Sequence, residues 1–573
     1  GWYATAILTI KEYLTEKFEY SVGSLAQEAP IDVQLLTAEH EKLVDELTVV
    51  RDLVEPCFPP KYHIFDVFAE TYHMQTVELV QKILDAYASS LSTKDIIDIV
   101  NWIRDYHSQL DSLAAEVSPN LTEDLDRLLQ GYNYQTETMM RNWSGRILEE
   151  DLKMQPESGP DGRLYTIAPI DLFKMIGQQF EVVDVLGLER STYTLAMTVY
   201  NVLDDYRASV ESVLRDEWES LELTHIAAQT NNCTRMMDGC TQLLEDLEGK
   251  LEPERLENIE LPLLIDGFTA VSRHGTTAVC NVVFHDIGPL FQKLFTPKWL
   301  EGDKERVMDS IVATIKDYSE EVQGYLHETY YRKALIEILE RTVVMYAAQL
   351  LRLTTSHNVD ASGGIRSDAS SLEAVFTVCG LPARMMTARL KPMLLLASLS
   401  GVPLTVDAPE KEGKAGVPDL EKFAAEVTLW LEGAAAALPD VCTDAVSRIL
   451  KQRSDLDTRA RNAVLVRCNE LHTELVAKTK EKPSKSSAWA FFTDVYKELG
   501  VQPSAYVPTG DGVLTSLATM VTKGGQMRIR GTGHRRQPSA EAGGVLAAAA
   551  AEPEAVRGER GAAAIDIFYR LQL

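Results

Sequence analysis

The stretch Phe65–Tyr87 reads FDVFAETYHMQTVELVQKILDAY. Its large apolar side chains recur at steps of three and four residues, or at sums of these steps: Phe65, Phe68, Tyr72, Leu79, Ile83 and Tyr87. At this spacing they share one face of an α-helix. The next segment opens with Ser92-Thr93-Lys94-Asp95, a capping-box arrangement, and continues with the same apolar spacing. The two segments predict a pair of antiparallel helices joined by a short turn.

Two later stretches show the same helical pattern. One runs from Leu195 to Trp218, and the other runs from Val307 to Leu353 without a proline. A pattern as long as the second predicts either one very long helix or two nearly collinear helices, which is typical of rods and not of compact enzymes. Because strand signals are nearly absent, the sequence predicts an all-α fold, an elongated rod of consecutive helical bundles.

Stretches rich in Gly, Pro, Ser or charge interrupt this pattern at residues 21–30, 155–162, 359–371 and 401–418. We interpret the second and third as bundle boundaries. The fourth is a long loop inside a bundle, since apolar spacing resumes at Leu420. The expected units are an N-terminal bundle at 1–155, a middle bundle at 163–358 and a C-terminal bundle at 370–523. Residues 524–573 are dominated by Gly, Ala and Arg, which predicts a disordered tail.

The charge balance argues against one large class of partners. The 573 residues include 85 acidic and 56 basic side chains, and the formal net charge is −29. A surface of this sign repels a phosphate backbone, so broad binding to nucleic acid is not expected.

Cysteine usage and hydropathy indicate the compartment. The seven cysteines are scattered and form no dense framework, which favours a reducing environment: Cys57, Cys233, Cys240, Cys280, Cys379, Cys442 and Cys468. The most apolar stretch, Pro392–Val406, is interrupted by Ser, Gly and Pro and is too short to span a bilayer, so no transmembrane segment is expected. The chain starts with Gly-Trp-Tyr and not with Met, so we expect a fragment without its natural N-terminus.

Three groups of residues resemble metal sites, and none has the complete spacing. His327-Glu328 begins like a zinc-protease helix, but the position of the second histidine is Tyr331. Asp204-Asp205 is followed by Ala208 where a third carboxylate would be needed, so a solvated helix face is the better interpretation. The third group has intervals that match no zinc site and is interpreted as isolated core residues: Cys233, Cys240, His274, Cys280 and His285.

Phosphate-loop and nucleophile-elbow motifs are also missing from the sequence. The prediction is therefore a protein that is not an enzyme, with no catalytic, metal-binding or cofactor-binding residues and no cofactor. The alternative left open is an α-helical enzyme whose catalytic groups converge from distant helices.

One basic cluster stands out near the C-terminus, where no acidic residue occurs between Val513 and Ala540: Lys523, Arg528, Arg530, Arg535 and Arg536. Such a cluster would contact anionic lipid at a cytoplasmic membrane surface. The alternative is an unstructured tail without this role.

Several segments in fixed order over roughly residues 40–520 resemble a known family, exocyst complex component 3. They are Val54–Phe65 (VEPCFPPKYHIF), Ala168–Ile176 (APIDLFKMI) followed by Gln178-Gln179, then Asn231-Asn232-Cys233, Thr314–Tyr318 (TIKDY), Tyr330-Tyr331 and Arg341–Tyr346 (RTVVMY). The sequence departs from the family pattern after Arg352, where it continues LTTSH, and in its Gly/Ala/Arg tail.

The resemblance implies a rod of stacked helical bundles of the tethering-complex type, with an N-terminal coiled-coil region that this chain lacks. It implies a subunit that tethers secretory vesicles to the plasma membrane before SNARE-mediated fusion, with no catalytic residues. The implied partners are other exocyst subunits, plasma-membrane SNARE proteins and, indirectly, small GTPases and phosphoinositides. The implied location is the cytoplasm, peripheral at the plasma membrane at sites of exocytosis. The alternative is a helical adaptor of another membrane-trafficking complex.

Overall fold

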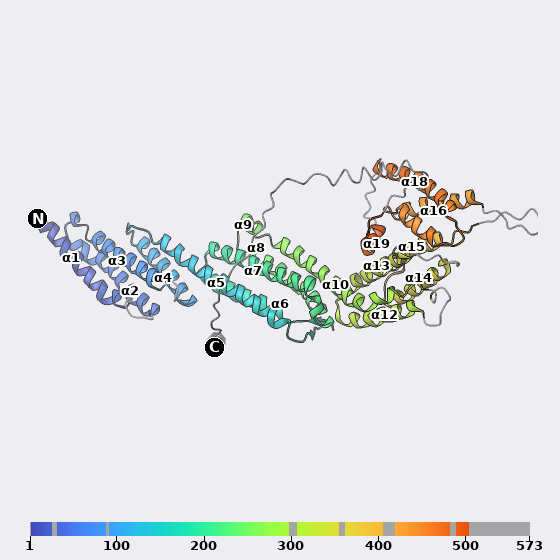
Figure 1. Ribbon diagram of the computed structural model, residues 1–573. Coiled ribbons are helices and arrows are strands. Elements are labelled where there is room, and N and C mark those ends of the chain that lie inside the picture. Colours follow the sequence, from blue (N-terminus) through green and yellow to red (C-terminus); the bar gives the residue numbers. More distant parts are fainter. Residues whose placement is uncertain are drawn as a thin grey trace, which may run out of the picture. The chain divides into compact units, whose positions relative to one another are not determined.

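The computed structural model of the chain describes residues 2–25, 31–87, 91–296, 299, 306–353, 361–404, 419–481 and 489–503. Most of these residues lie in helices, which Figure 1 shows coloured from blue to red along the chain. The strands among them are two short ones that form an antiparallel hairpin. Within these ranges, no helix combines the length and apolar composition that a bilayer span requires. The predicted all-α fold of consecutive helical bundles is therefore confirmed.

The N-terminal helices follow the sequence pattern closely. They are α1 (Trp2–Phe18), α2 (Val33–Val49), α3 (Ile64–Tyr87), α4 (Thr93–Ser112) and α5 (Thr122–Asp151). The predicted capping box is present, because Ser92 Oγ accepts from Asp95 N while the Asp95 carboxylate accepts from Ser92 N. α4 packs on α2 and α5, and it reaches α3 through a 3.1 Å contact between the Tyr106 hydroxyl and His73 Nδ1. The predicted pair of helices is thus part of a larger bundle.

A buried histidine lies at the centre of these helices. Trp102 Nε1 donates to His40 Nδ1 at 3.1 Å, so the proton of the neutral ring lies on Nε2, which faces Thr76 Oγ1 at 2.8 Å. The Thr76 hydroxyl in turn donates to the carbonyl of Tyr72. A second proton on the ring would face the indole N–H. Burial lowers the pKa of His40 from 6.5 to about 3, so the ring is held neutral.

The stability of this bundle should therefore depend on acidity. Between pH 6.5 and about 3 the unfolded chain binds a proton at His40 that the folded chain does not, so the free energy of unfolding falls as the pH falls. We expect His40→Gln, which cannot be protonated, to lower the slope of stability against pH, measured as thermal midpoints from pH 7 to pH 5. The exposed His285, changed to Gln, serves as the control. An unchanged slope in His40→Gln would contradict this account.

The middle of the chain continues with a hairpin and five helices. These are β1 (Glu157–Ser158), β2 (Leu164–Tyr165), α6 (Ala168–Leu186), α7 (Glu189–Asp216), α8 (Leu223–Glu248), α9 (Pro253–Glu257) and α10 (Leu261–Phe291). α10 packs along α7 and α8, α5 packs along α6 and α7, and the hairpin lies on α8. The break in the helical pattern at 155–162 therefore contains the first strand of this hairpin and part of its turn.

Asn231 on α8 is fully buried and connects two irregular segments to that helix. Its Nδ2 donates to the carbonyl oxygens of Leu164 at 2.7 Å and of Tyr325 at 2.8 Å. Its Oδ1 accepts from the backbone N–H of His327 at 2.8 Å. One side-chain amide therefore satisfies three part-buried main-chain groups: the carbonyl of Leu164 in β2, the carbonyl of Tyr325 at the end of α12, and the N–H of His327 between α12 and α13.

The neighbouring Asn232 makes a second connection of the same kind. Its Oδ1 accepts from Thr166 N at 3.2 Å, and its Nδ2 donates to Thr166 Oγ1. The Thr166 hydroxyl donates to Asp151 Oδ2 at 2.7 Å, and Asp151 Oδ1 also accepts from Ala168 N at 3.3 Å. Burial raises the pKa of Asp151. These contacts join the end of α5 and the start of α6 to α8.

Removal of the Asn231 amide should be costly. In Asn231→Ala, two carbonyl oxygens and one N–H, all part-buried, lose this partner, so we expect the unfolding free energy to fall by about 2–4 kcal/mol. Thermal denaturation followed by circular dichroism measures the change. Asn142→Ala, at an exposed position of α5, is the matched control and should shift stability by no more than about 0.5 kcal/mol. Equal thermal midpoints for the two variants would show that the Asn231 amide does not contribute this stability.

The proline-free stretch Val307–Leu353 forms two helices, α12 (Val307–Tyr325) and α13 (Glu328–Arg352). Leu326 and His327 between them have extended ψ values of 145° and 143°, which ends one helix before the next begins. The His327 ring then caps α13, since its Nδ1 accepts from Thr329 N. The single long helix is therefore absent. The other alternative is right in the number of helices but wrong in their collinearity, because Arg306 before α12 and Tyr346 near the end of α13 contact the same carboxylate, that of Asp368, so the two helices fold back on each other.

The break predicted at residues 359–371 is wrong from position 361 onward, because α14 spans Ala361–Val378 and packs on α15 (Ala383–Ser400). The glycines and serines of α14 allow side chains of neighbouring segments to approach this helix closely. A Cβ on Gly364 would lie 2.7 Å from the ring of Trp299, and one on Gly401 would lie 2.8 Å from Ser362. The small residues that suggested a loop are therefore contact points between helices.

Asp368 shows why α14 is fixed in place. Its carboxylate is fully buried, and it accepts from Tyr346 Oη at 2.8 Å and from Trp299 Nε1 at 3.0 Å. Arg306, just before α12, pairs with it at 2.6 Å. Asp368 therefore joins α14 to α13 and to the start of α12.

The C-terminal helices are α16 (Leu420–Ala437), α17 (Thr443–Gln452), α18 (Thr458–Glu481) and α19 (Phe491–Leu499). α16 begins where apolar spacing was predicted to resume. α18 packs on α16 and α17, while α17 and α19 pack on α13. Gln452 Nε2 donates to the carbonyl of Leu350 at 2.6 Å, which joins the end of α17 to the last turn of α13.

The division into bundles at 1–155, 163–358 and 370–523 remains a proposal. Contacts cross its borders, because α5 packs on α6 and α7, and α13 packs on α15, α17 and α19. The loop expected at 401–418 lies mostly outside the described residues, as does the whole tail at 524–573.

Candidate functional site

The acidic pair Asp204-Asp205 is engaged by arginines. Asp204 Oδ1 accepts from Arg207 Nε at 2.7 Å, and Asp205 pairs with Arg141 of α5. The pair therefore has cationic partners within the fold, as expected for a helix face. Glu328 pairs in the same way with Arg332, one turn along α13.

The three cysteines considered as metal ligands are buried thiols: Cys233 and Cys240 lie on α8, and Cys280 lies on α10. Burial raises the pKa of Cys233 and of Cys240 to about 12 in each case, and it raises the pKa of Cys280. A protonated thiol is a poor nucleophile and a poor metal ligand. Among the residues that the structure describes, no three His, Cys, Asp or Glu side chains lie close enough together to hold a metal ion.

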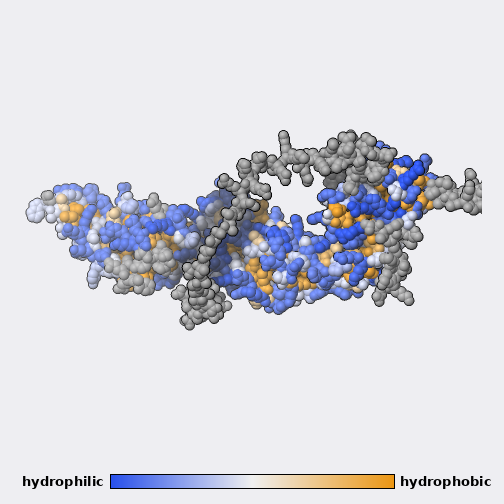
Figure 2. All heavy atoms as spheres, in the orientation of Figure 1, coloured by the Kyte–Doolittle hydropathy of each residue, from blue (hydrophilic) through white to orange (hydrophobic). Residues whose placement is uncertain are grey.

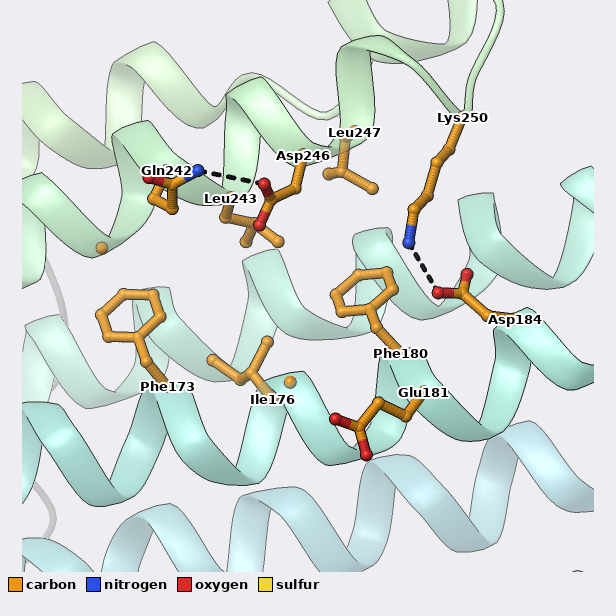
Figure 3. Close-up of a pocket in the computed structure, with 12 residues that line it drawn as sticks. Phe173, Ile176, Phe180, Glu181, Asp184, Gln242, Leu243, Asp246, Leu247 and Lys250 are labelled. Atoms are coloured by element: carbon orange, nitrogen blue, oxygen red, sulfur yellow. Dashed lines mark hydrogen bonds and ion pairs between the residues drawn. The ribbon is translucent and has the colours of Figure 1, made fainter.

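A groove lies between α6 and α8, with a volume of about 420 Å³ (Figure 3). We call it the α6–α8 groove and define it by its lining residues: Phe173, Ile176, Gly177, Phe180, Glu181 and Asp184 on α6, and Gly239, Gln242, Leu243, Asp246, Leu247 and Lys250 on α8. On both helices these positions recur at steps of three and four. The groove therefore follows the helices and is lined by one face of each.

The floor of the groove is apolar. Phe173 and Phe180 project from α6 toward α8, and Leu243 and Leu247 project from the opposite helix (Figure 3). Phe180 and Leu243 are almost fully buried, while Phe173 is partly exposed. The floor thus belongs to the core of the helix pair and leaves part of one aromatic ring open to a ligand.

The rim of the groove is acidic. Glu181, Asp184 and Asp246 are all exposed there, against the single cation Lys250. Lys250 Nζ lies 2.7 Å from Asp184 Oδ2, and Gln242 Nε2 donates to Asp246 Oδ1 at 3.0 Å (Figure 3). Because the Lys250–Asp184 pair is solvent-exposed, it contributes little to stability. With three carboxylates and one ammonium group, the rim has a net negative charge.

Two glycines shape the groove in opposite ways. A Cβ on Gly239 would lie 2.2 Å from the ring of Phe173, so that ring packs directly over the α8 backbone. A Cβ on Gly177 would meet no atom within 4 Å. Gly177 therefore leaves the middle of the groove open, and a side chain placed there would fill it without a clash.

Lys523, Arg528, Arg530, Arg535 and Arg536 all lie outside the described residues. Sequence reasoning in turn missed the α6–α8 groove, although it quoted Phe173 within the segment APIDLFKMI. The available signal was the apolar spacing Phe173, Ile176, Phe180 followed by acidic residues.

Comparison with known proteins decides the family. Residues 1–406 match the family model described as "Exocyst complex component Sec6". The chain belongs to this exocyst family. The resemblance proposed from the quoted segments is thereby confirmed, and the match includes both walls of the α6–α8 groove.

Individual exocyst relatives are distant. Exocyst complex component 3 of Drosophila melanogaster is 25% identical over 310 residues, which cover 50% of this chain and 40% of the fly protein. Exocyst complex component sec6 of Schizosaccharomyces pombe is 24% identical over 366 residues, covering 58% of this chain and 47% of the yeast protein. The chain thus spans less than half the length of these two relatives.

A solved structure from the exocyst supports the fold. The crystal structure of the C-terminal domain of the exocyst subunit Sec6p aligns with a TM-score of 0.54 at 15% identity. The alignment covers 64% of this chain and 96% of that domain. At this identity the likeness establishes a shared helical architecture.

Proposed function

We propose that this chain is a non-catalytic subunit of the exocyst that tethers secretory vesicles to the plasma membrane before SNARE-mediated fusion. The observation that carries the proposal is the family match over residues 1–406. The helical-bundle architecture agrees with it, because long helices present extended faces to several partners at once. An adaptor role in another trafficking complex is disfavoured by that match.

Binding, and not bond chemistry, performs such a task. A tether raises the effective concentration of the fusion machinery near the target membrane, and a stiff helical body restricts the conformations that a flexible linker would sample. Figure 2 shows a largely hydrophilic surface with small hydrophobic areas on the face in view. This surface suits several limited docking areas, and its acidity would accelerate encounter with basic partners.

The proposed partners are the other exocyst subunits and plasma-membrane SNARE proteins. Small GTPases and phosphoinositides would be reached through the assembled complex. The proposed location is the cytoplasm, peripheral at the plasma membrane where exocytosis takes place.

Crosslinking mass spectrometry on the affinity-purified native complex tests this function. We expect exocyst subunits to co-purify with the full-length protein and to crosslink to lysines on its helices, because the family match predicts a direct subunit contact. Recovery of another tethering complex's subunits, with none from the exocyst, would refute the proposal. A measurable turnover of any substrate by the purified chain would refute its non-catalytic part.

The basic cluster at Lys523–Arg536 is proposed to contact anionic lipid. Each basic residue near a charged membrane contributes about 1 kcal/mol, so replacing all five by Ala should weaken binding to phosphatidylserine vesicles at least about tenfold. Sedimentation with vesicles measures this. Replacement of the three arginines further along the tail, Arg557, Arg560 and Arg570, is the control and should have a smaller effect, since acidic residues are interspersed among them. Equal binding by wild type and the five-residue variant would contradict the lipid contact.

A further inference from the structure

We propose that the α6–α8 groove binds an amphipathic helix of a protein partner. This helix would insert one or two leucine-type side chains between Phe173 and Phe180 and place Lys or Arg side chains along the acidic rim. The inference rests on the proposed function, since it names the chemistry of one partner of the tether.

The shape of the groove favours a helical partner. Its lining residues repeat at one-turn intervals on both walls, so a third helix laid along it would meet matching contacts at each turn. Gly177 leaves a hole in the α6 wall between the positions of Phe173 and Phe180, because a Cβ there would meet no atom within 4 Å. A side chain inserted into such a hole is the usual packing unit of associated helices.

The charge of the groove selects among such helices. Three carboxylates stand on the rim against one ammonium group, which is already paired with Asp184. A helix with basic flanks would be attracted to this rim, whereas an anionic membrane or a nucleic acid would be repelled. The occupant therefore combines aliphatic side chains with basic ones, the composition of a basic amphipathic helix.

The first test fills the hole. The probe is a synthetic helical peptide of about 20 residues with leucine at heptad positions a and d and lysine at e and g, labelled for fluorescence anisotropy. We expect it to bind the intact chain, and we expect Gly177→Leu to weaken binding at least about tenfold. Gly145→Leu on α5 is the matched control, since its added side chain also meets open space. Both changes replace Gly by a better helix former, so neither should lower the thermal midpoint.

The second test reverses the rim charge. Combined Glu181→Lys and Asp246→Lys should weaken peptide binding at least about tenfold at low salt, with a smaller effect at high salt. Glu78→Lys on the exposed face of α3 is the control for charge reversal and should change binding by less than about twofold. A peptide with glutamate in place of lysine should lose binding to the wild type.

Three results would overturn the inference. The first is that the leucine–lysine peptide binds no better than a peptide with serine in place of leucine, and the second is that Gly177→Leu and Gly145→Leu bind the peptide equally well. The third is that the chain associates with itself and that Gly177→Leu abolishes this self-association. The last would identify a second copy of the chain as the occupant. If the peptide fails to bind while exocyst subunits still co-purify with the chain, the groove proposal fails and the proposed function stands. If the peptide binds as expected but no exocyst subunit co-purifies, the proposed function fails and the groove proposal stands.

Discussion

The hydrogen bonds of one buried amide, the Asn231 side chain, hold together parts of the chain that helical packing alone would leave unconnected. Asn231 satisfies main-chain groups of the hairpin and of the corner between α12 and α13, segments that lie 67 and 94 residues from it. Apolar side chains can pack against such segments but cannot form hydrogen bonds with their peptide N–H and C=O groups. An unpaired peptide group removed from water costs about 1–3 kcal/mol, so the hydrogen bonds from Asn231 offset a cost that packing the hairpin and the α12–α13 corner against α8 would otherwise carry.

The α6–α8 groove depends on the same region. Asn232 and Asp151 both form hydrogen bonds with Thr166, and Asp151 also accepts from the backbone N–H of Ala168, the first residue of α6. The start of α6 is thereby fixed against α8. This placement brings Phe173 over Gly239 and leaves Gly177 facing open space. The candidate docking surface is therefore a consequence of how the hairpin is attached, and not of residues selected only for binding.

The sequence predicted those features that depend on local pattern. The helix at 65–87, the capping box at Ser92 and the start of α16 near Leu420 agree with the structure, because spacing and capping are encoded within a few residues. The break at 359–371 was wrong because Gly364 and Ser362 serve contacts with distant residues, and composition alone does not distinguish a loop from tight helix packing. The groove was missed for a related reason, since its lining residues on α6 and on α8 lie more than 50 positions apart in the sequence. Asn231 and Asn232 were noticed only through family resemblance, because one sequence does not show which main-chain groups lack partners.

The central claim is that buried side-chain amides protect main-chain groups outside the helical ladders. Hydrogen–deuterium exchange with single-residue resolution on the intact chain tests it most directly, at the backbone N–H groups of His327 and Thr166. The account predicts that both exchange as slowly as amides in the middle of α8, because each donates to an oxygen of a buried asparagine. Exchange of these two amides at the rate of an exposed turn would contradict it.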